Sequence, residues 1–580
     1  MVRSLIHLPD EILNSILCYS SPQSCAAVEQ THARFRNVTN EPLLWRRYCQ
    51  SHYNYWDERH EMRQKFTRPV QSTDWKAIFV NKYLVDRSVT RLLDSILESQ
   101  TGRIEKSRSV VDLGYDAKDT LLRHSRVESG EDVLARRYYA RALLTCLHRS
   151  IAVPEWAKLR RGESVQLERA LGCFDLFVPG SGDGDLNQIQ ESLGRILRRF
   201  AASRPDVALL SPRDKALAIA SWLGANGLTG IEPGREYHSL EHNFLGMALN
   251  NTGHNSLPLV SAVIYCFVAR GNGLNAQPCG FPFHVHVIVT PQPGLDMSGN
   301  PLAGGRQGEP MYLDPFRGAR ETPVSALRSQ LAFLGMPTLD QTTTLSESDT
   351  SAVVLRCGKN ILNSVRIESQ QPGTPIAFVD VVGAKYAAIW SKMLLSNESR
   401  PMDLRRDLPQ LMELFATEFP TDMFLMEQYI VPLFQGLPEH NHVLESLRIM
   451  KAVDEIPKSR RKRSGGNTNI QYSVGQVFRH RRYNYTAIIT GWDSECGAGE
   501  QWMMRMGIDR LEAGRHQSFY HVLVEDRSVR YVAEENIEPV LLDFTDLPSS
   551  LTAIAGKHFK RWDEHNMRFI SNMRDEYPDD

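Results

Sequence analysis

The stretch PCGFPFHVHVIV, residues 278–289, places His284 and His286 two positions apart in an apolar run. A second apolar stretch, MYLDPF, residues 311–316, carries Asp314. Residues 279–290 and 310–316, which overlap these stretches, each predict a strand. Residues 291–310 predict the loop between them, because 9 of these 20 residues are proline or glycine. A histidine on one strand and an aspartate on the next form two parts of a cysteine-hydrolase site.

Length and composition bound the class of protein. The chain has 580 residues, of which 42% are hydrophobic, so we expect three or four domains with separate cores. The net charge of −1 predicts no general attraction to nucleic acid or to an anionic membrane. The 9 cysteines include no C-x-x-C pair. This argues against a disulfide framework and a zinc site, so we expect no metal or other cofactor and a reducing compartment.

The start of the chain, MVRSLIHLPDEIL, lacks the uninterrupted apolar core of a signal peptide. His7, Pro9, Asp10 and Glu11 interrupt the apolar residues. Since no window of about 18 apolar residues occurs anywhere, we expect no membrane span. We therefore expect an intracellular protein, cytoplasmic, nuclear or both, with no membrane partner.

Changes in pattern along the chain predict a multidomain α+β protein. Three-to-four-residue apolar spacing predicts helices in the first half, PGSGDGD at 179–185 predicts a loop, and period-two alternation predicts strands after Tyr472. The predicted segments are a three-helix domain at 1–55, a helical linker region at 70–180, an α+β domain with a helical extension at 185–452, a basic and Gly/Asn-rich linker at 453–469, a small antiparallel β-barrel at 470–541 and a tail at 542–580.

The first segment resembles an F-box. The resemblance rests on LPDEILNSIL (8–17), CAAVEQTHARFRNV (25–38) and PLLWRRYC (42–49). F-boxes bind the Skp-type adaptor of cullin-RING ubiquitin ligases through a helical face. The resemblance implies the adaptor-binding or core positions Leu8, Pro9, Ile12, Ile16 and Trp45. The alternative is an ordinary helical bundle that keeps these side chains internal.

The middle segment resembles the SirB-type branch of the transglutaminase-like fold. The motifs are PLVSAVIYCFVARGNGL (258–274), GFPFH (280–284) and LDPF (313–316). In that fold a cysteine at the start of the core helix lies about fifteen residues before a glycine, and counting back from Gly273 reaches Pro258. The resemblance therefore implies a remnant dyad of His284 and Asp314 without a nucleophile, and no catalytic residue.

Other side chains are poorly placed to replace the cysteine. Ser261 is rotated away from the required direction on the helix, Cys266 is about 12 Å further along it, and Cys279 faces the other side of a regular strand. His286 would face the same side as His284. A third metal ligand at useful spacing is not evident, so a buried, hydrogen-bonded His286 is favoured over a metal ligand.

The C-terminal strands resemble a YccV/HspQ-like domain, also described as hemimethylated-DNA-binding. The stretches are YSVGQVFRHRRYNYTAIITGWD (472–493) and FYHVLVEDRSVRYVAEENIEPV (519–540). The signature residues are Gly475, His480, Tyr483, Trp492, Tyr520 and Tyr531. Residues 470–541 hold 8 Arg, no Lys and 10 acidic residues, so a net charge of about −2 favours a protein-docking surface over a nucleic-acid partner.

The basic run KSRRKR, residues 458–463, is compatible with a nuclear import signal, a phosphate-contacting patch or plain solubility. Taken together, the resemblances imply a non-catalytic substrate-recognition subunit of a Skp–cullin–F-box ubiquitin ligase. Its partners would be the adaptor, the cullin ligase and an unidentified client protein. Two alternatives remain: an active transglutaminase-like amide hydrolase using Cys266 or Ser261, and a DNA-associated factor using the C-terminal domain.

Overall fold

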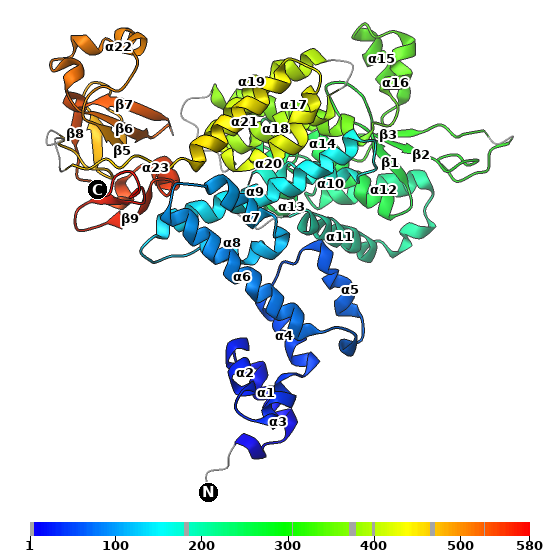
Figure 1. Ribbon diagram of the computed structural model, residues 1–580. Helices are drawn as coiled ribbons and strands as arrows, with labels where there is room; N and C mark the ends of the chain where they lie inside the picture. The colour runs from blue at the N-terminus through cyan, green and yellow to red at the C-terminus, as the bar shows by residue number, and fades with distance from the viewer. Residues whose placement is uncertain are drawn as a thin grey trace. The chain divides into compact units, whose positions relative to one another are not determined.

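The computed structural model describes residues 5–178, 185–303, 306–370, 379–396, 401–463, 470–526 and 528–580. The chain divides into two compact units, Met1–Leu147 with Ser446–Asp580, and His148–Glu445. Helices dominate both units and every sheet is antiparallel (Figure 1), which confirms the predicted multidomain α+β class. Within the described ranges, no helix is both long and apolar enough to cross a bilayer.

The first unit begins with short helices, as predicted. They are α1 (Asp10–Cys18), α2 (Pro22–Glu29), α3 (Ala33–Thr39) and α4 (Pro42–His52). The stretch 25–38, which the sequence predicts to hold one of three helices, is divided between α2 and α3, because the His32 side chain accepts a hydrogen bond from the Arg34 amide and caps a new helix. Leu13, Leu17 and Trp45 lie in the core of this bundle.

More helices follow in the same unit, as the apolar spacing of this region predicts. They are α5 (Met62–Thr67), α6 (Trp75–Glu98), α7 (Arg103–Val111), α8 (Lys118–Ser125) and the first half of α9 (Val133–Arg160). Trp75 and Phe79 of α6 pack into the core of the N-terminal bundle. The N-terminal helices therefore do not form an isolated module, since α6 completes their core.

The second unit is helical around one small sheet. Its helices are the rest of α9, α10 (Leu167–Gly172), α11 (Leu186–Ser203), α12 (Pro212–Ala225), α13 (Leu245–Asn250), α14 (Pro258–Gly271), α15 (Val324–Phe333), α16 (Thr338–Thr344), α17 (Thr350–Ser369), α18 (Val381–Leu395), α19 (Pro401–Glu418) and the start of α21 (Glu439–Glu455). The sheet has the order β1-β2-β3, with β1 at Asn275–Pro278, β2 at Val287–Thr290 and β3 at Met311–Leu313. The predicted loop at 179–185 lies almost entirely outside the described residues.

The segment that carries both histidines is not part of a strand. The sequence predicts a strand through residues 279–290, but β2 begins only at Val287, and residues 280–286 are irregular. The amide of His284 donates to the carbonyl oxygen of Pro282 across 2.7 Å, and Phe283 between them has φ +63°. This tight turn interrupts the pleat, because a strand requires extended backbone at each position.

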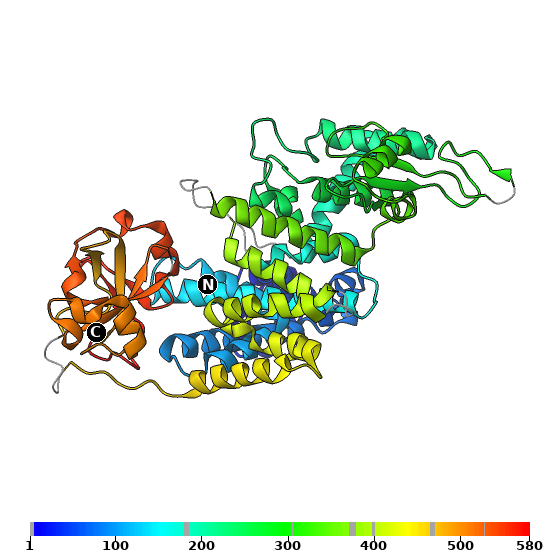
Figure 2. The same ribbon diagram turned by 90° about the horizontal axis from the view of Figure 1, so that it is seen from above.

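The C-terminal part of the first unit contains a five-stranded antiparallel sheet in the order β7-β6-β5-β4-β8. Figure 2 shows this part of the chain in orange and red. Its elements are β4 (Val477–His480), β5 (Thr486–Asp493), α22 (Glu500–Met506), β6 (Phe519–Val524), β7 (Val529–Ala533) and β8 (Ile537–Pro539). Residues 542–580, interpreted from sequence as a tail, form α23 (Ser549–Ala555) and the hairpin β9–β10 (Phe559–Asp563 and Arg568–Ser571). Leu551, Phe559 and Phe569 lie in the same core as the sheet, so the domain continues past 541.

Candidate functional site

Strand pairing brings the predicted dyad together at one edge of the small sheet. Val287 at the start of β2 pairs with Leu313 at the end of β3. Because the two strands are antiparallel, the residues before β2 and after β3 meet at the same edge. His284 and Asp314 therefore become neighbours, although they are 30 positions apart in the sequence.

The two side chains form a partly buried hydrogen-bonded pair. His284 Nε2 lies 2.7 Å from Asp314 Oδ2, and Arg317 Nε lies 3.7 Å from the same oxygen. Burial opposes ionisation of Asp314, but the hydrogen bond and charge of His284 outweigh it and hold the pKa of this carboxyl below its usual value. Because Asp314 is ionised, Nε2–H of His284 is the donor.

His286 lies beside His284 but is chemically different. The two ring centroids are 5.3 Å apart, and the Phe281 ring packs against His286 at 5.1 Å. Burial lowers the pKa of His286 to about 4, so its imidazole is neutral near pH 7. Its buried Nδ1 has no hydrogen-bond partner in the part of the chain that the structure describes, contrary to the expectation of a satisfied core histidine.

The α14 helix begins at Pro258, fifteen residues before Gly273. Leu257 occupies the cap and Pro258 the first turn, and both are buried. Ser261 is also buried, and its Oγ lies 2.7 Å from Ser256 Oγ and accepts a hydrogen bond from the Gly230 amide at 3.1 Å. The hydroxyl is therefore engaged in local structure.

Two cysteines considered as substitutes for the nucleophile are deeply buried. Burial raises the pKa of Cys266 to about 12 and that of Cys279 to about 11. The thiol of Cys279 donates to the carbonyl oxygen of Thr344 at 3.5 Å. Within the described ranges, His284 makes no hydrogen bond to a cysteine sulfur or serine hydroxyl, and no three His, Cys, Asp or Glu side chains cluster as metal ligands.

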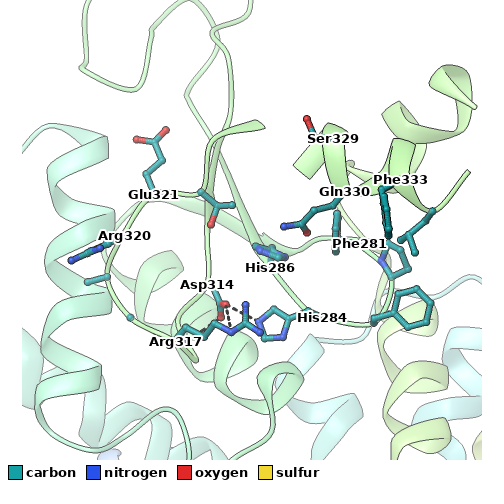
Figure 3. A pocket seen from close by; sticks show the side chains of 16 residues that line it. Phe281, His284, His286, Asp314, Arg317, Arg320, Glu321, Ser329, Gln330 and Phe333 are labelled. Atoms are coloured by element: carbon teal, nitrogen blue, oxygen red, sulfur yellow. Dashed lines mark hydrogen bonds and ion pairs between the residues drawn. The ribbon is translucent and has the colours of Figure 1, made fainter. Parts of the chain in front are cut away.

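A cavity of about 1000 Å³ opens over the His284–Asp314 pair (Figure 3). His284, His286 and Asp314, which the sequence singles out, line this cavity. The sequence does not single out the other side chains that line it. Arg317 and Arg320 follow Asp314 in the run LDPFRGAR, and their proximity in sequence is a usable signal. Phe333 comes from α15, and neither its spacing nor its neighbours in sequence indicate the cavity.

The positions that the F-box resemblance implies differ in how far they are exposed. Ile12 and Ile16 of α1 are 48% and 45% exposed, Pro9 is exposed, and Leu8 is half-buried. Trp45 is 2% exposed, and its indole N–H donates to the carbonyl oxygen of Thr39, so it belongs to the core. Other large apolar side chains exposed on this segment are Leu5, Tyr19 and Leu43.

The predicted signature residues of the C-terminal sheet have mainly structural contacts. Gly475 has φ +89°, and a Cβ there would collide with the carbonyl oxygen of Phe569. Trp492 is buried and donates to Asp580 at 2.9 Å, and the hydroxyl of Tyr520 donates to Glu534 at 2.7 Å.

The remaining signature residues differ in burial: His480 is buried, Tyr531 is half-buried and Tyr483 is exposed. Nδ1 of His480 accepts from the amides of Arg482 and Tyr483, and the side chain of Tyr483 is exposed. Tyr531 donates to Asp493 at 2.7 Å.

Two arginines of the basic run 458–463 form ion pairs with the same C-terminal domain. Arg461 forms an ion pair with Asp493, and Arg463 lies 2.7 Å from Asp580. These two arginines therefore neutralise carboxylates of their own chain, whereas Arg460 and Lys462 are exposed.

Comparison with known proteins gives three matches, in the order of the three predicted domains. Residues 5–51 match the family described as F-box-like, residues 187–358 the transglutaminase-like superfamily, and residues 470–566 the family described as hemimethylated DNA-binding protein YccV like. The chain contains an F-box-like, a transglutaminase-like and a YccV-like segment. The third match extends beyond 541, in agreement with the continuation of the core.

Among curated proteins, the chain is similar to F-box only protein 21 of several mammals. It is 37% identical over 109 residues to the mouse protein, which is 18% of this chain and 17% of that protein. The orangutan (Pongo abelii) protein is 36% identical over 109 residues, 18% of each chain, and the human protein is 36% identical over 109 residues, 18% of this chain and 17% of that protein. The alignment thus covers less than a fifth of these relatives. No solved structure matches the chain.

Proposed function

We propose that this protein is a substrate-recognition subunit of a Skp–cullin–F-box ubiquitin ligase. The exposed apolar face of α1 carries the proposal, because Ile12 and Ile16 lie in a segment that matches an F-box-like family. Water-exposed isoleucines one turn apart are unfavourable in a free chain and are covered when a partner helix packs against them. The F-box only proteins among the relatives support the same role.

In this proposal the transglutaminase-like segment binds a client and catalyses no bond chemistry. Pro258 has no nucleophilic atom, the Ser261 hydroxyl is hydrogen-bonded within the core, and burial keeps Cys266 protonated. The protein then acts by raising the concentration of client lysines near a ubiquitin-charged enzyme. In this proposal, the side chains around His284 and Asp314 form a surface that contacts the client.

Co-expression with the Skp-type adaptor tests the proposal. We expect the full chain to co-purify with the adaptor, and we expect Ile16→Asp to reduce recovery at least about tenfold, as for a central interface residue. Leu84→Asp is the matched control, because Leu84 of α6 is 55% exposed and lies outside the adaptor-binding face. Equal recovery of the wild type and Ile16→Asp, or no recovery of the wild type, would overturn the proposal.

A further inference from the structure

The cavity over the His284–Asp314 pair has charges that are not balanced within the protein. Its two carboxylates have partners within the protein: Asp314 is hydrogen-bonded to His284 and lies 3.7 Å from Arg317, and Glu321 forms an ion pair with Arg213. Arg320 lines the cavity, is exposed, and has no ion-pair partner in the described part of the chain. The cavity therefore offers an unused guanidinium, which favours an anionic group in the ligand.

The rim of the cavity is aromatic and exposed. Phe283 is 88% exposed and Phe333 of α15 is 92% exposed. Phe283 is also the central residue of the tight turn at 282–284, with φ +63°, a backbone conformation that side chains of this size rarely adopt. Strained backbone of this kind clusters at active sites and ligand-binding segments.

The third observation is the unpartnered nitrogen of His286. The side chain is only 6% exposed, yet Nδ1 has no hydrogen-bond partner in the described chain. Figure 3 draws His286 between the Asp314–Arg317 side of the cavity and the Phe281–Phe333 side. A buried polar atom without a partner is costly, and a polar group of a bound ligand would satisfy it.

We propose that this cavity binds a segment of the client protein that carries an acidic and an aromatic side chain within a few positions of each other. The aromatic side chain packs against Phe283 and Phe333, and the carboxylate pairs with Arg320. A backbone or side-chain polar group of the segment completes the hydrogen bonding of His286. This inference rests on the proposed function, because it supplies the chemistry by which the substrate receptor holds its client.

Fluorescence anisotropy with the full chain tests this inference. The probe is a fluorescein-labelled Gly/Ser peptide with one phenylalanine and a glutamate two positions away on each side, titrated at low salt. The matched peptide has glutamine in place of both glutamates. We expect saturable binding of the acidic peptide and at least about tenfold weaker binding of the glutamine peptide.

Variants of exposed residues locate the binding without disturbing the core. We expect Arg320→Glu and Phe333→Ser each to weaken binding of the acidic peptide about tenfold, and Arg306→Glu, an exposed position outside the cavity, to leave it unchanged. A peptide with lysine for glutamate should bind Arg320→Glu more tightly than the wild type. Equal binding of the acidic and glutamine peptides, or undiminished binding by Arg320→Glu, would overturn the inference.

The same protein preparations are assayed for adaptor co-purification, which separates this inference from the proposed function. Arg320→Glu that binds the adaptor but has lost the peptide supports the inference. If the wild type binds the adaptor but neither peptide, the inference about the client segment is overturned and the proposed ligase role is not. A wild type that fails to bind the adaptor overturns the proposed ligase role itself.

Discussion

Two neighbouring imidazoles in the cavity differ in what surrounds them. His284 is hydrogen-bonded to the carboxylate of Asp314, whereas His286 packs against Phe281 and its Nδ1 has no hydrogen-bond partner among the described residues. In an active transglutaminase-like site, the histidine of a pair such as His284–Asp314 would accept a proton from a thiol. Here His284 and Asp314 line the cavity, and among the described residues no thiol makes a hydrogen bond to His284. In our proposal, the role of the pair is therefore binding.

The pKa of His286 predicts a measurable pH dependence. An unperturbed histidine has a pKa of about 6.5, and burial lowers that of His286 to about 4. As pH falls from 6.5 towards 4, the unfolded chain binds this proton and the folded chain does not, so stability decreases, by about 3 kcal/mol in total. Hydrogen–deuterium exchange at the imidazole C2 carbon, read by mass spectrometry, should give a midpoint near 4 in the native protein.

The urea-denatured chain is the control for His286, since its histidine should titrate near 6.5 in the same peptide. A second comparison uses His286→Asn, which should lose less stability than the wild type between pH 6.5 and pH 5 because it lacks the titrating group. A native midpoint near 6.5 would contradict the burial of this side chain.

Thiol reactivity distinguishes a binding site from an active hydrolase. With pKa values of about 12 and 11, fewer than about one in a thousand Cys266 or Cys279 side chains is a thiolate at pH 7.5. We expect neither to be alkylated during brief iodoacetamide treatment, while the half-buried Cys18 and Cys496 react. Peptide mapping reports each site, and labelling of Cys266 that disappears in His284→Ala would support the hydrolase alternative.

Among the structural elements, the ends of helices are predicted from the sequence more accurately than the conformation of the segment that carries His284 and His286. Pro258 and the glycines after Arg270 mark the two ends of α14, because local chemistry determines caps. The strand predicted for residues 279–290 fails over its first half, because apolar alternation does not reveal the tight turn at Phe283. The position of α15 over the cavity depends on contacts distant in sequence, which no local pattern encodes.

The N-terminal helices show the same limit. Ile12 and Trp45 are both apolar residues of amphipathic helices, yet the first is exposed and the second is buried. The difference arises because α6, some thirty residues further along, supplies Phe79 to the core around Trp45, with the ring centroids 5.4 Å apart. Sequence patterns predict which face is apolar but not which apolar residues the rest of the chain covers.

Gly475 connects the elements of the C-terminal domain. Its amide donates to Ile489 of β5 at 2.8 Å, and its carbonyl oxygen accepts from the Phe569 amide of β10 at 2.9 Å. Gly475→Ala adds a Cβ that collides with the Phe569 carbonyl and forces an unfavourable φ, so we expect a loss of about 2 kcal/mol or more in stability. Thermal unfolding followed by tryptophan fluorescence of this domain measures the loss.

Gly499→Ala is the matched control for Gly475→Ala. Gly499 has φ −68°, and nothing lies within 4 Å of a Cβ added there. We expect its melting temperature to stay within about 2 °C of the wild type, because surface substitutions of this kind change stability little. Equal effects of the two substitutions would show that β10 does not pack on Gly475 as described.

In the whole molecule, we propose that different segments have different tasks. The F-box-like helices present an exposed apolar face, the transglutaminase-like segment holds a cavity, and the YccV-like segment is a sheet whose core includes residues up to Tyr577. The order of these segments follows from sequence motifs alone, whereas the cavity wall and the extended C-terminal core depend on tertiary packing. A receptor of this organisation would join adaptor and client without altering a covalent bond.

Calorimetric titration of the full chain with the purified Skp-type adaptor measures the proposed adaptor binding itself. We expect saturable one-to-one binding by the wild type and by Leu84→Asp, and no detectable heat of binding with the double substitution of Ile12 and Ile16 by aspartate. Circular dichroism of the double variant confirms that it is folded, since both side chains are exposed. Equal affinity of the wild type and the folded double variant would contradict the proposal.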